Sequence, residues 1–267
     1  MGNGLPPFST LKHCVQVGEN VAKSAGKILL DWQSRFTVTE KSRSNLVTEA
    51  DFSSQQLIVN SLRTHFPDHG LIGEEDELDT SVDSSSEFCW IIDPLDGTGN
   101  YVHGMPYFAV SIGLQYKGEL VAGIVYDPTR QESFTAFKNG GARLNNKVIH
   151  CSQNSPLKNA MCVASLPVDG NPHHPAMARF LKVLPEAQSV QRLGSAALNL
   201  AYVACGRIDG FWSQTLKPWD MAAGVVIARE AGAQVTQMDG NTFDVMTPNI
   251  LATNGTVIHN ELIPLVR

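Results

Sequence analysis

A short apolar segment that runs straight into two aspartates constrains the fold of this 267-residue chain more than any other feature. Residues 88–92 read Phe-Cys-Trp-Ile-Ile, which predicts a buried strand. Asp93 follows at once, Pro94 fixes a turn, and Asp96 completes it. Two carboxylates at the end of a buried strand are costly unless a cation lies between them. We therefore expect a divalent cation with oxygen ligands here, and Mg²⁺ is the ion typical of a few carboxylates and a phosphate.

Glu74 and Asp220 are the further acids that we expect at this site. Asp220 falls in the first turn of an amphipathic segment, and Glu74 opens an acidic, serine-rich stretch. Each acid also has an ordinary explanation. An aspartate in a first turn interacts favourably with the helix dipole, Glu74 fits a solvated run of charge, and Asp96-Gly97 fits a simple turn.

Charge and composition argue against several classes of function. Lys and Arg number 20 against 26 Asp and Glu, a net charge of −6, so nucleic acid is not an expected partner and neither is an anionic membrane. The chain contains no apolar run long enough to cross a bilayer and no N-terminal export pattern. Its five cysteines form no CxxC pair, which fits free thiols in a reducing compartment, so we expect a cytoplasmic protein.

Apolar periodicity predicts two halves of different character. Helical segments are expected over 9–32, from the capping box at 48–51 to Pro67, and over 195–205 and 220–231. Strands are expected at 88–92, 109–116, 120–126, 132–137, 160–164, 208–212, 234–238 and 249–253, with a polar loop at 42–47. We expect one catalytic unit, with an N-terminal α+β subdomain (1–147) and a C-terminal α/β subdomain (148–267) sharing a cleft.

Three blocks of the sequence resemble the signatures of the inositol monophosphatase family. They are Gly-Glu-Glu at 73–75, Trp-Ile-Ile-Asp-Pro-Leu-Asp-Gly-Thr-Gly-Asn at 90–100, and Lys-Pro-Trp-Asp-Met-Ala-Ala-Gly at 217–224. The resemblance extends to 41–51 and to Gly-Ser-Ala-Ala at 194–197, and so covers nearly the whole chain. The central Asp-Pro-Leu-Asp-Gly-Thr motif is highly specific.

This resemblance implies a Mg²⁺-dependent, lithium-sensitive phosphomonoesterase, usually a homodimer. The implied fold is the layered αβαβα sandwich of the inositol monophosphatase/fructose-1,6-bisphosphatase type. The implied substrate is a small phosphorylated metabolite, by default inositol 1-phosphate, with histidinol phosphate, fructose 1,6-bisphosphate and a 3′-phosphoadenosine nucleotide as alternatives. Some bacterial relatives act through protein contacts in RNA processing, so a non-catalytic regulatory protein of the same fold is the other alternative.

By position in the motifs, the resemblance implies two to three Mg²⁺ ions that share ligands. Glu74, Asp93 and the backbone carbonyl of Leu95 are expected to hold the first ion. Asp93, Asp96 and Asp220 are expected to hold the second, and a weaker third ion depends on Glu74. Such ions activate a water, neutralise phosphate oxygens and stabilise the leaving alkoxide.

The resemblance also implies catalytic roles near the metals. Glu74 and Thr98 are expected to orient the attacking water, and Asp51 to support Thr98, although Asp51 also completes the capping box. The N–H groups of Gly97 and Thr98 would bind phosphate if they open a short helix. An aspartyl-phosphate mechanism requires two aspartates separated by one residue, whereas Asp93 and Asp96 are separated by two. The spacing therefore disfavours that mechanism.

Substrate contacts are expected from Ser195, Ala196 and Ser213. Ser213 stands where inositol-selective members place a glutamate, so recognition of ring hydroxyls should differ in this chain. Lys41 is a further candidate site residue.

Overall fold

A seven-stranded sheet forms the centre of the first half of the molecule. The computed structural model describes residues 4–33, 35, 37–42, 45–75, 86–167 and 171–267. The sheet follows chain order: β3 (Gly70–Gly73), β4 (Phe88–Asp96), β5 (Ala109–Tyr116), β6 (Glu119–Asp127), β7 (Glu132–Phe137), β8 (Ala142–Leu144) and β9 (Lys147–Val148). β3 and β4 are parallel, and each later neighbour is antiparallel, so the strands predicted at 109–116, 120–126 and 132–137 form an antiparallel meander.

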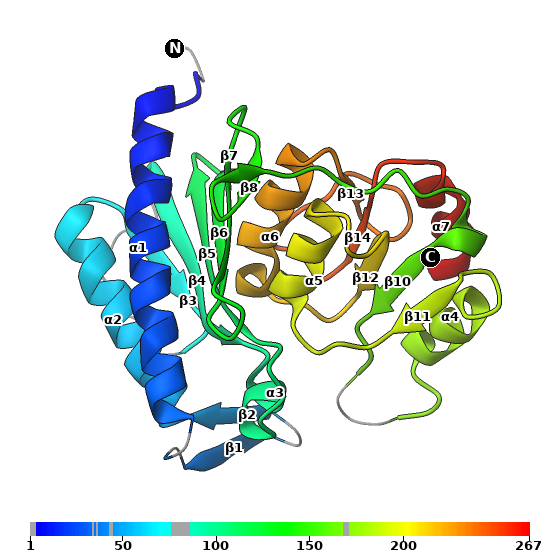
Figure 1. Cartoon of the computed structure of the whole chain (residues 1–267), viewed down its shortest axis with the longest axis horizontal. Helices are drawn as coiled ribbons and strands as arrows, with labels where there is room; N and C mark the ends of the chain where they lie inside the picture. Colours follow the sequence, from blue (N-terminus) through cyan, green and yellow to red (C-terminus); the bar gives the residue numbers. More distant parts are fainter. Residues whose placement is uncertain (1–3, 34, 36, 43–44, 76–85, 168–170) are drawn as a thin grey trace.

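Helices cover both faces of this sheet. α1 (Phe8–Trp32) and α2 (Glu49–His65) lie on one face, and α5 (Ala196–Ala204) and α6 (Pro218–Glu230) lie on the other (Figure 1). The approach is close: a Cβ on Gly18 of α1 would lie 2.8 Å from Ile124, and one on Gly123 of β6 would lie 2.2 Å from the Ala223 carbonyl oxygen. These glycines let α1 and α6 pack tightly on opposite sides of β6.

A second, five-stranded sheet lies beyond α5 and α6. Its order is β11 (Ser189–Gln191), β10 (Met161–Ala164), β12 (Gly210–Ser213), β14 (Ile250–Thr253) and β13 (Gln234–Thr236). Phe211 of β12 packs with the α5 and α6 core, whereas its neighbour Trp212 packs with α4 (Pro175–Val183) and α7 (Ile258–Val266). The successive layers are therefore αβαβα, as the resemblance implied (Figure 1).

The structure corrects several sequence-based boundaries. The predicted loop at 42–47 is wrong at 42 and at 45–47, where β1 (Val38–Ser42) pairs with β2 (Asn45–Thr48), while 43–44 lie outside the described residues. Leu-Val-Thr at 46–48 favours a strand. The strand predicted at 88–92 continues to Asp96 through a bulge.

Short elements escaped the sequence analysis for identifiable reasons. α4 begins at a proline in a Pro- and His-rich stretch, and α7 contains Pro264, which reads as a helix breaker. Other elements contain too few residues to show a period of hydrophobic residues: β3, β8, β9, β11, the short α3 (Thr98–Val102) and the 3₁₀ helix η1 (Leu157–Asn159).

The five cysteines are free thiols, as expected. Within the described part of the chain, no helix is both long and apolar enough to cross a membrane.

Candidate active site

The end of β4 is bent by a bulge that carries the two aspartates. Asp93 pairs with Ser111 of β5 and Asp96 pairs with Ala109, so one extra residue is accommodated in β4. The Leu95 N–H donates to Asp93 Oδ1 at 3.0 Å, and Ser54 Oγ donates to the Pro94 carbonyl at 2.9 Å. These bonds fix the direction in which both carboxylates point.

Asp220 reaches the same point from α6. Ser111 Oγ donates to the Trp219 carbonyl at 3.3 Å, which ties the start of α6 to β5. Asp220 Oδ2 accepts the Lys217 N–H at 2.7 Å, and carboxylate oxygens of Asp93, Asp96 and Asp220 lie within 4.8 Å of one another. Asp220 therefore caps its helix and also joins the acid cluster.

Burial holds the pKa values of these three acids above their ordinary range, and repulsion from neighbouring acids adds to this effect at Asp93 and Asp220. Asp93 is 1% exposed, and burial followed by the charges of Glu74, Asp96 and Asp220 raises its pKa well above normal. Burial raises the pKa of Asp96 to about 6, and burial followed by the Asp96 charge raises that of Asp220 to about 7. A bound divalent cation relieves this repulsion, so the oxygen donors fit a metal site.

The N-terminus of α5 is directed at Asp96. Ser195 Oγ donates to Asp96 Oδ2 at 2.5 Å, the Ala197 N–H donates to the same oxygen at 2.7 Å, and the Ala196 N–H donates to Oδ1 at 3.2 Å. These bonds favour the ionised carboxylate and oppose the effect of burial on its pKa. Of this group the sequence analysis named Ser195 and Ala196, as substrate contacts, and missed Ala197.

Glu74 lies close to Asp93 of the acid cluster. Its N–H donates to the Ile92 carbonyl at 3.2 Å, which continues the pairing of β3 with β4, and its charge is the second cause of the raised Asp93 pKa. The next residue, Glu75, is 2% exposed, and its backbone exchanges hydrogen bonds of 3.0 and 3.2 Å with the Gln55 side chain. Gln55 thus anchors this loop to α2, a role that the sequence did not indicate.

Thr98 and Asp51 meet beside the bulge. Thr98 Oγ1 donates to the Leu95 carbonyl at 3.1 Å and lies 3.4 Å from Asp51 Oδ1. Asp51 accepts the Thr48 N–H at 2.8 Å, so the predicted capping box is present. Burial raises the pKa of Asp51 to about 6, against the effect of its bonds from Thr48.

Gly97 is the N-cap residue of α3 and has φ +98°, a conformation that favours glycine. A Cβ there would also lie 3.0 Å from the Tyr107 carbonyl oxygen. The short helix that phosphate binding by the Gly97 and Thr98 N–H groups requires is therefore present, although no sequence period predicted it.

Two candidates from the sequence are not joined to this group. Ser213 is buried on β12, and among the described residues its hydroxyl has one hydrogen bond, accepted from the Thr215 N–H at 3.4 Å. The side chain of Lys41 lies outside the described residues.

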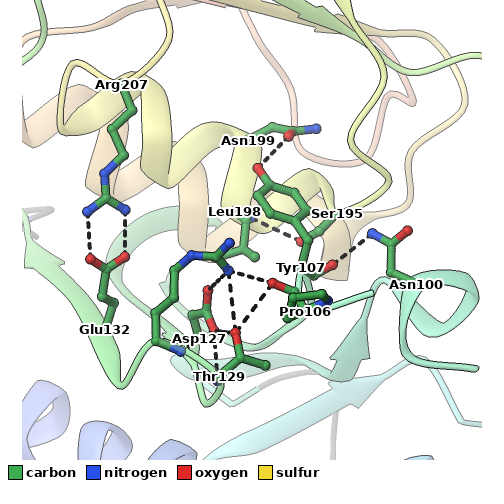
Figure 2. A network of polar contacts seen from close by, with 11 residues as sticks. Asn100, Pro106, Tyr107, Asp127, Thr129, Glu132, Ser195, Leu198, Asn199 and Arg207 are labelled. Atoms are coloured by element: carbon green, nitrogen blue, oxygen red, sulfur yellow. Dashed lines mark hydrogen bonds and ion pairs between the residues drawn. The ribbon is translucent and has the colours of Figure 1, made fainter. Parts of the chain in front are cut away.

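Asn100 and Tyr107, which the sequence analysis did not select, connect α3 with α5 (Figure 2). Asn100 Nδ2 donates to the Tyr107 and Leu193 carbonyls, both at 2.8 Å, and Tyr107 OH donates to Asn199 Oδ1 at 2.9 Å. A Cβ on Gly194 would lie 2.9 Å from Asn100 Nδ2. This close contact holds the loop before Ser195, and with it the donors that face Asp96.

The β6–β7 turn supports the Pro106–Tyr107 segment, whose Tyr107 carbonyl accepts a bond from Asn100. Arg130 donates to the Pro106 carbonyl at 2.5 Å and to Asp127 at 3.0 Å. Arg207 forms a bidentate pair with Glu132, with both distances 2.5 Å (Figure 2). The Arg207–Glu132 pair joins the first sheet to the residues that follow α5, whereas the Arg130 bonds lie within the first half of the chain.

Comparison with known proteins identifies the family. Residues 11–267 match the model of the inositol monophosphatase family. The chain belongs to that family. Family members are phosphoric monoester hydrolases, so the class of enzyme expected from the resemblance is confirmed together with the fold.

Similar proteins carry two kinds of name. An inositol-1-monophosphatase from Synechocystis is 40% identical over 95% of this chain and 88% of its own. A Nus factor SuhB from Vibrio cholerae is 39% identical over 90% and 87%. The solved structure of the extragenic suppressor protein suhB from Bartonella henselae matches with a TM-score of 0.90 at 36% identity, covering 96% of this chain and 98% of that one.

Proposed function

We propose that this protein hydrolyses a small phosphomonoester in the cytoplasm with Mg²⁺ as cofactor, and that inositol 1-phosphate is its default substrate. The observation that carries the proposal is the buried cluster of Asp93, Asp96 and Asp220 within 4.8 Å, at the motifs of a phosphomonoesterase family. The name of the Synechocystis relative supports the choice of substrate.

Two to three Mg²⁺ ions fit the proposal, held by Glu74, Asp93, the Leu95 carbonyl, Asp96 and Asp220. When bound, the metal supplies an activated water and neutralises charge on the phosphate and on the leaving oxygen. The raised pKa values of Asp93, Asp96 and Asp220 support this assignment, since ionised carboxylates this close together need a positive partner.

The other residues act by positioning. We assign Thr98 and Glu74 to orienting the attacking water, with Asp51 holding the Thr98 hydroxyl, and the N–H groups of Gly97 and Thr98 to binding phosphate oxygens. Ser195 hydrogen-bonds Asp96, which supports a position for the Ser195–Ala196 segment at the edge of the substrate site.

Ser213 completes the proposed substrate site from β12. Its uncharged hydroxyl favours a substrate whose ring does not require a carboxylate partner. This leaves histidinol phosphate, fructose 1,6-bisphosphate and 3′-phosphoadenosine nucleotides as substrates to compare with inositol 1-phosphate.

The test is phosphate release from these four substrates by the wild type and by Asp96→Asn, with and without Mg²⁺. We expect Mg²⁺-dependent release from at least one substrate, inhibition by millimolar Li⁺, and a loss of at least about 100-fold in Asp96→Asn. Wild-type rates in Asp96→Asn would refute the mechanism. Rates indifferent to Li⁺ would count against the inositol-like assignment.

A regulatory role is the second candidate, because a relative of 39% identity is named a Nus factor. Under that reading, protein partners captured by the wild type are also captured by Asp96→Asn at equal yield.

We also expect a homodimer, which light scattering on the purified protein tests directly.

A further inference from the structure

A groove opens between α1 and the β7–β8 edge of the first sheet. Its volume is about 610 Å³, within the range of small-molecule sites. It exists because two helices side by side cover only about 20 Å, whereas seven strands span about 29 Å. α1 and α2 therefore leave the far edge of that sheet face open (Figure 1).

The floor of the groove is formed by side chains on the α1 face of the sheet. Thr135 pairs with Ile124, which contacts Gly18 of α1, and Arg143 pairs with Thr135, so all three residues of the sheet lie on one face. Thr135 is only 7% exposed, and its hydroxyl has no hydrogen-bond partner among the described residues. The hydroxyl oxygen is not fully buried, so it opens into the groove and can bond a ligand placed there.

The wall formed by α1 is polar and carries an excess of positive charge. Lys12, Gln16, Glu19 and Lys23 follow one another at helical spacing and line the groove. Glu19 is already paired with Lys23 at 2.6 Å. Lys12 and Arg143 have no ion pair with any described residue, so two cations remain for a ligand in a chain of net charge −6.

Aromatic rings complete the groove. Phe8 is 59% exposed, and its ring meets the edge of Phe137 at 4.7 Å between centroids. The exposed Phe8 ring, held edge-to-face against the buried Phe137, offers a flat apolar body a surface on which to pack.

We propose that this groove binds a small organic anion with a flat apolar body, whose phosphoryl or carboxylate group contacts Lys12, Arg143 and the Thr135 hydroxyl and whose body packs on Phe8 and Phe137. The site is separate from the acid cluster, because α1 lies on the opposite face of the sheet from α6, which carries Asp220. The proposal is independent of the substrate proposed above.

The test is isothermal titration of the full-length protein with phenylphosphonate, benzoate and methylphosphonate, each with and without Mg²⁺. None of the three contains a phosphate ester, so active protein does not consume them. Without Mg²⁺ the acid cluster repels anions, and binding in that condition reports the groove. We expect phenylphosphonate to bind more tightly than methylphosphonate, and its rank against benzoate to identify the preferred anionic group.

Substitutions locate the bound probe. Arg143→Gln should weaken phenylphosphonate binding about tenfold, and Lys12→Gln and Thr135→Val should each weaken it a few-fold. Lys158→Gln, which removes an exposed lysine outside the groove, should leave the affinity within about twofold. The proposal is overturned if no probe binds at about 10 mM, if methylphosphonate binds as well as phenylphosphonate, or if Arg143→Gln and Lys12→Gln bind as the wild type does.

Discussion

Replacing Asp93 with asparagine should stabilise the metal-free protein while abolishing its activity. Asparagine has nearly the same shape, and its Oδ1 can still accept the Leu95 N–H that now lies 3.0 Å from the carboxylate. What the substitution removes is a charge that lies within 4.8 Å of the Asp96 and Asp220 carboxylates. At this distance two unit charges repel by about 3 kcal/mol at an effective dielectric constant of about 20.

The size of the effect depends on pH in a defined direction. The folded-state pKa values lie above the ordinary value of about 3.9, at about 6 for Asp96, at about 7 for Asp220, and well above normal for Asp93. The folded state therefore binds more protons than the unfolded state, and stability falls as pH rises from about 4 through these values. Because proton uptake relieves part of the repulsion, we expect Asp93→Asn to raise the free energy of unfolding by about 2–4 kcal/mol at pH 8 and by little at pH 4.

The assay is thermal unfolding in EDTA at several pH values, repeated in Mg²⁺. The gain at pH 8 corresponds to a rise in Tm of about 5–10 °C. Mg²⁺ should raise the Tm of the wild type more than that of Asp93→Asn, because the variant has lost a ligand. Asp209→Asn is the matched control: this buried carboxylate accepts bonds from Ser152, Asn154 and the Met161 N–H, so its loss should lower the Tm. A variant at position 93 that is no more stable than the wild type at pH 8 would refute the reasoning.

Three further predictions concern positioning and packing. Thr98→Val should lower kcat about 100-fold with little change in KM, and Thr98→Ser should restore most of it, as phosphate-release kinetics will determine. Asn100→Ala should lower kcat about tenfold and raise the Mg²⁺ concentration for half-maximal activity, because the donors to Asp96 lose their anchor, whereas the exposed Asn60→Ala should change neither. Gly123→Ala should lower the Tm by about 6–12 °C, since the new Cβ would meet the Ala223 carbonyl at 2.2 Å, whereas Gly4→Ala, with nothing within 4 Å, should leave the Tm unchanged.

The features that the sequence predicted well are those whose cause is local. The apolar run before Asp93 and the proline after it lie within a few residues, and they sufficed to predict a buried strand that leads into two acids, although not its continuation to Asp96. The capping box at Thr48 and Asp51 is equally local, and it is present. Asp220 was linked to the cluster through a motif and not through a physical pattern, since nothing near it indicates that α6 begins beside β4.

The features that were missed depend on contacts between distant residues. Asn100 bonds the Leu193 carbonyl 93 positions away, and Ala197 donates to Asp96 101 positions away. No periodicity or charge pattern predicts such pairs. A polar side chain or a helix N-terminus has the same local sequence pattern whether or not it has a partner in the other half of the chain. The strand β2 was missed for a different reason: its polar flanks outweighed the strand preference of Leu46 and Val47 in the sequence-based prediction.

The charge of the acid cluster depends on residues from both halves of the chain, which determines whether one half alone can be active. Asp96 is buried, yet its pKa rises only to about 6, because Ser195, Ala196 and Ala197 donate to it from α5. Without these donors burial alone would favour the neutral acid, which binds metal poorly. The donors and Asp220 all come from residues after 147, whereas Asp93 and Asp96 come from before it. We therefore expect a fragment of residues 1–147, which lacks Asp220 and the α5 donors, to have no Mg²⁺-dependent activity, and the catalytic unit to require both halves.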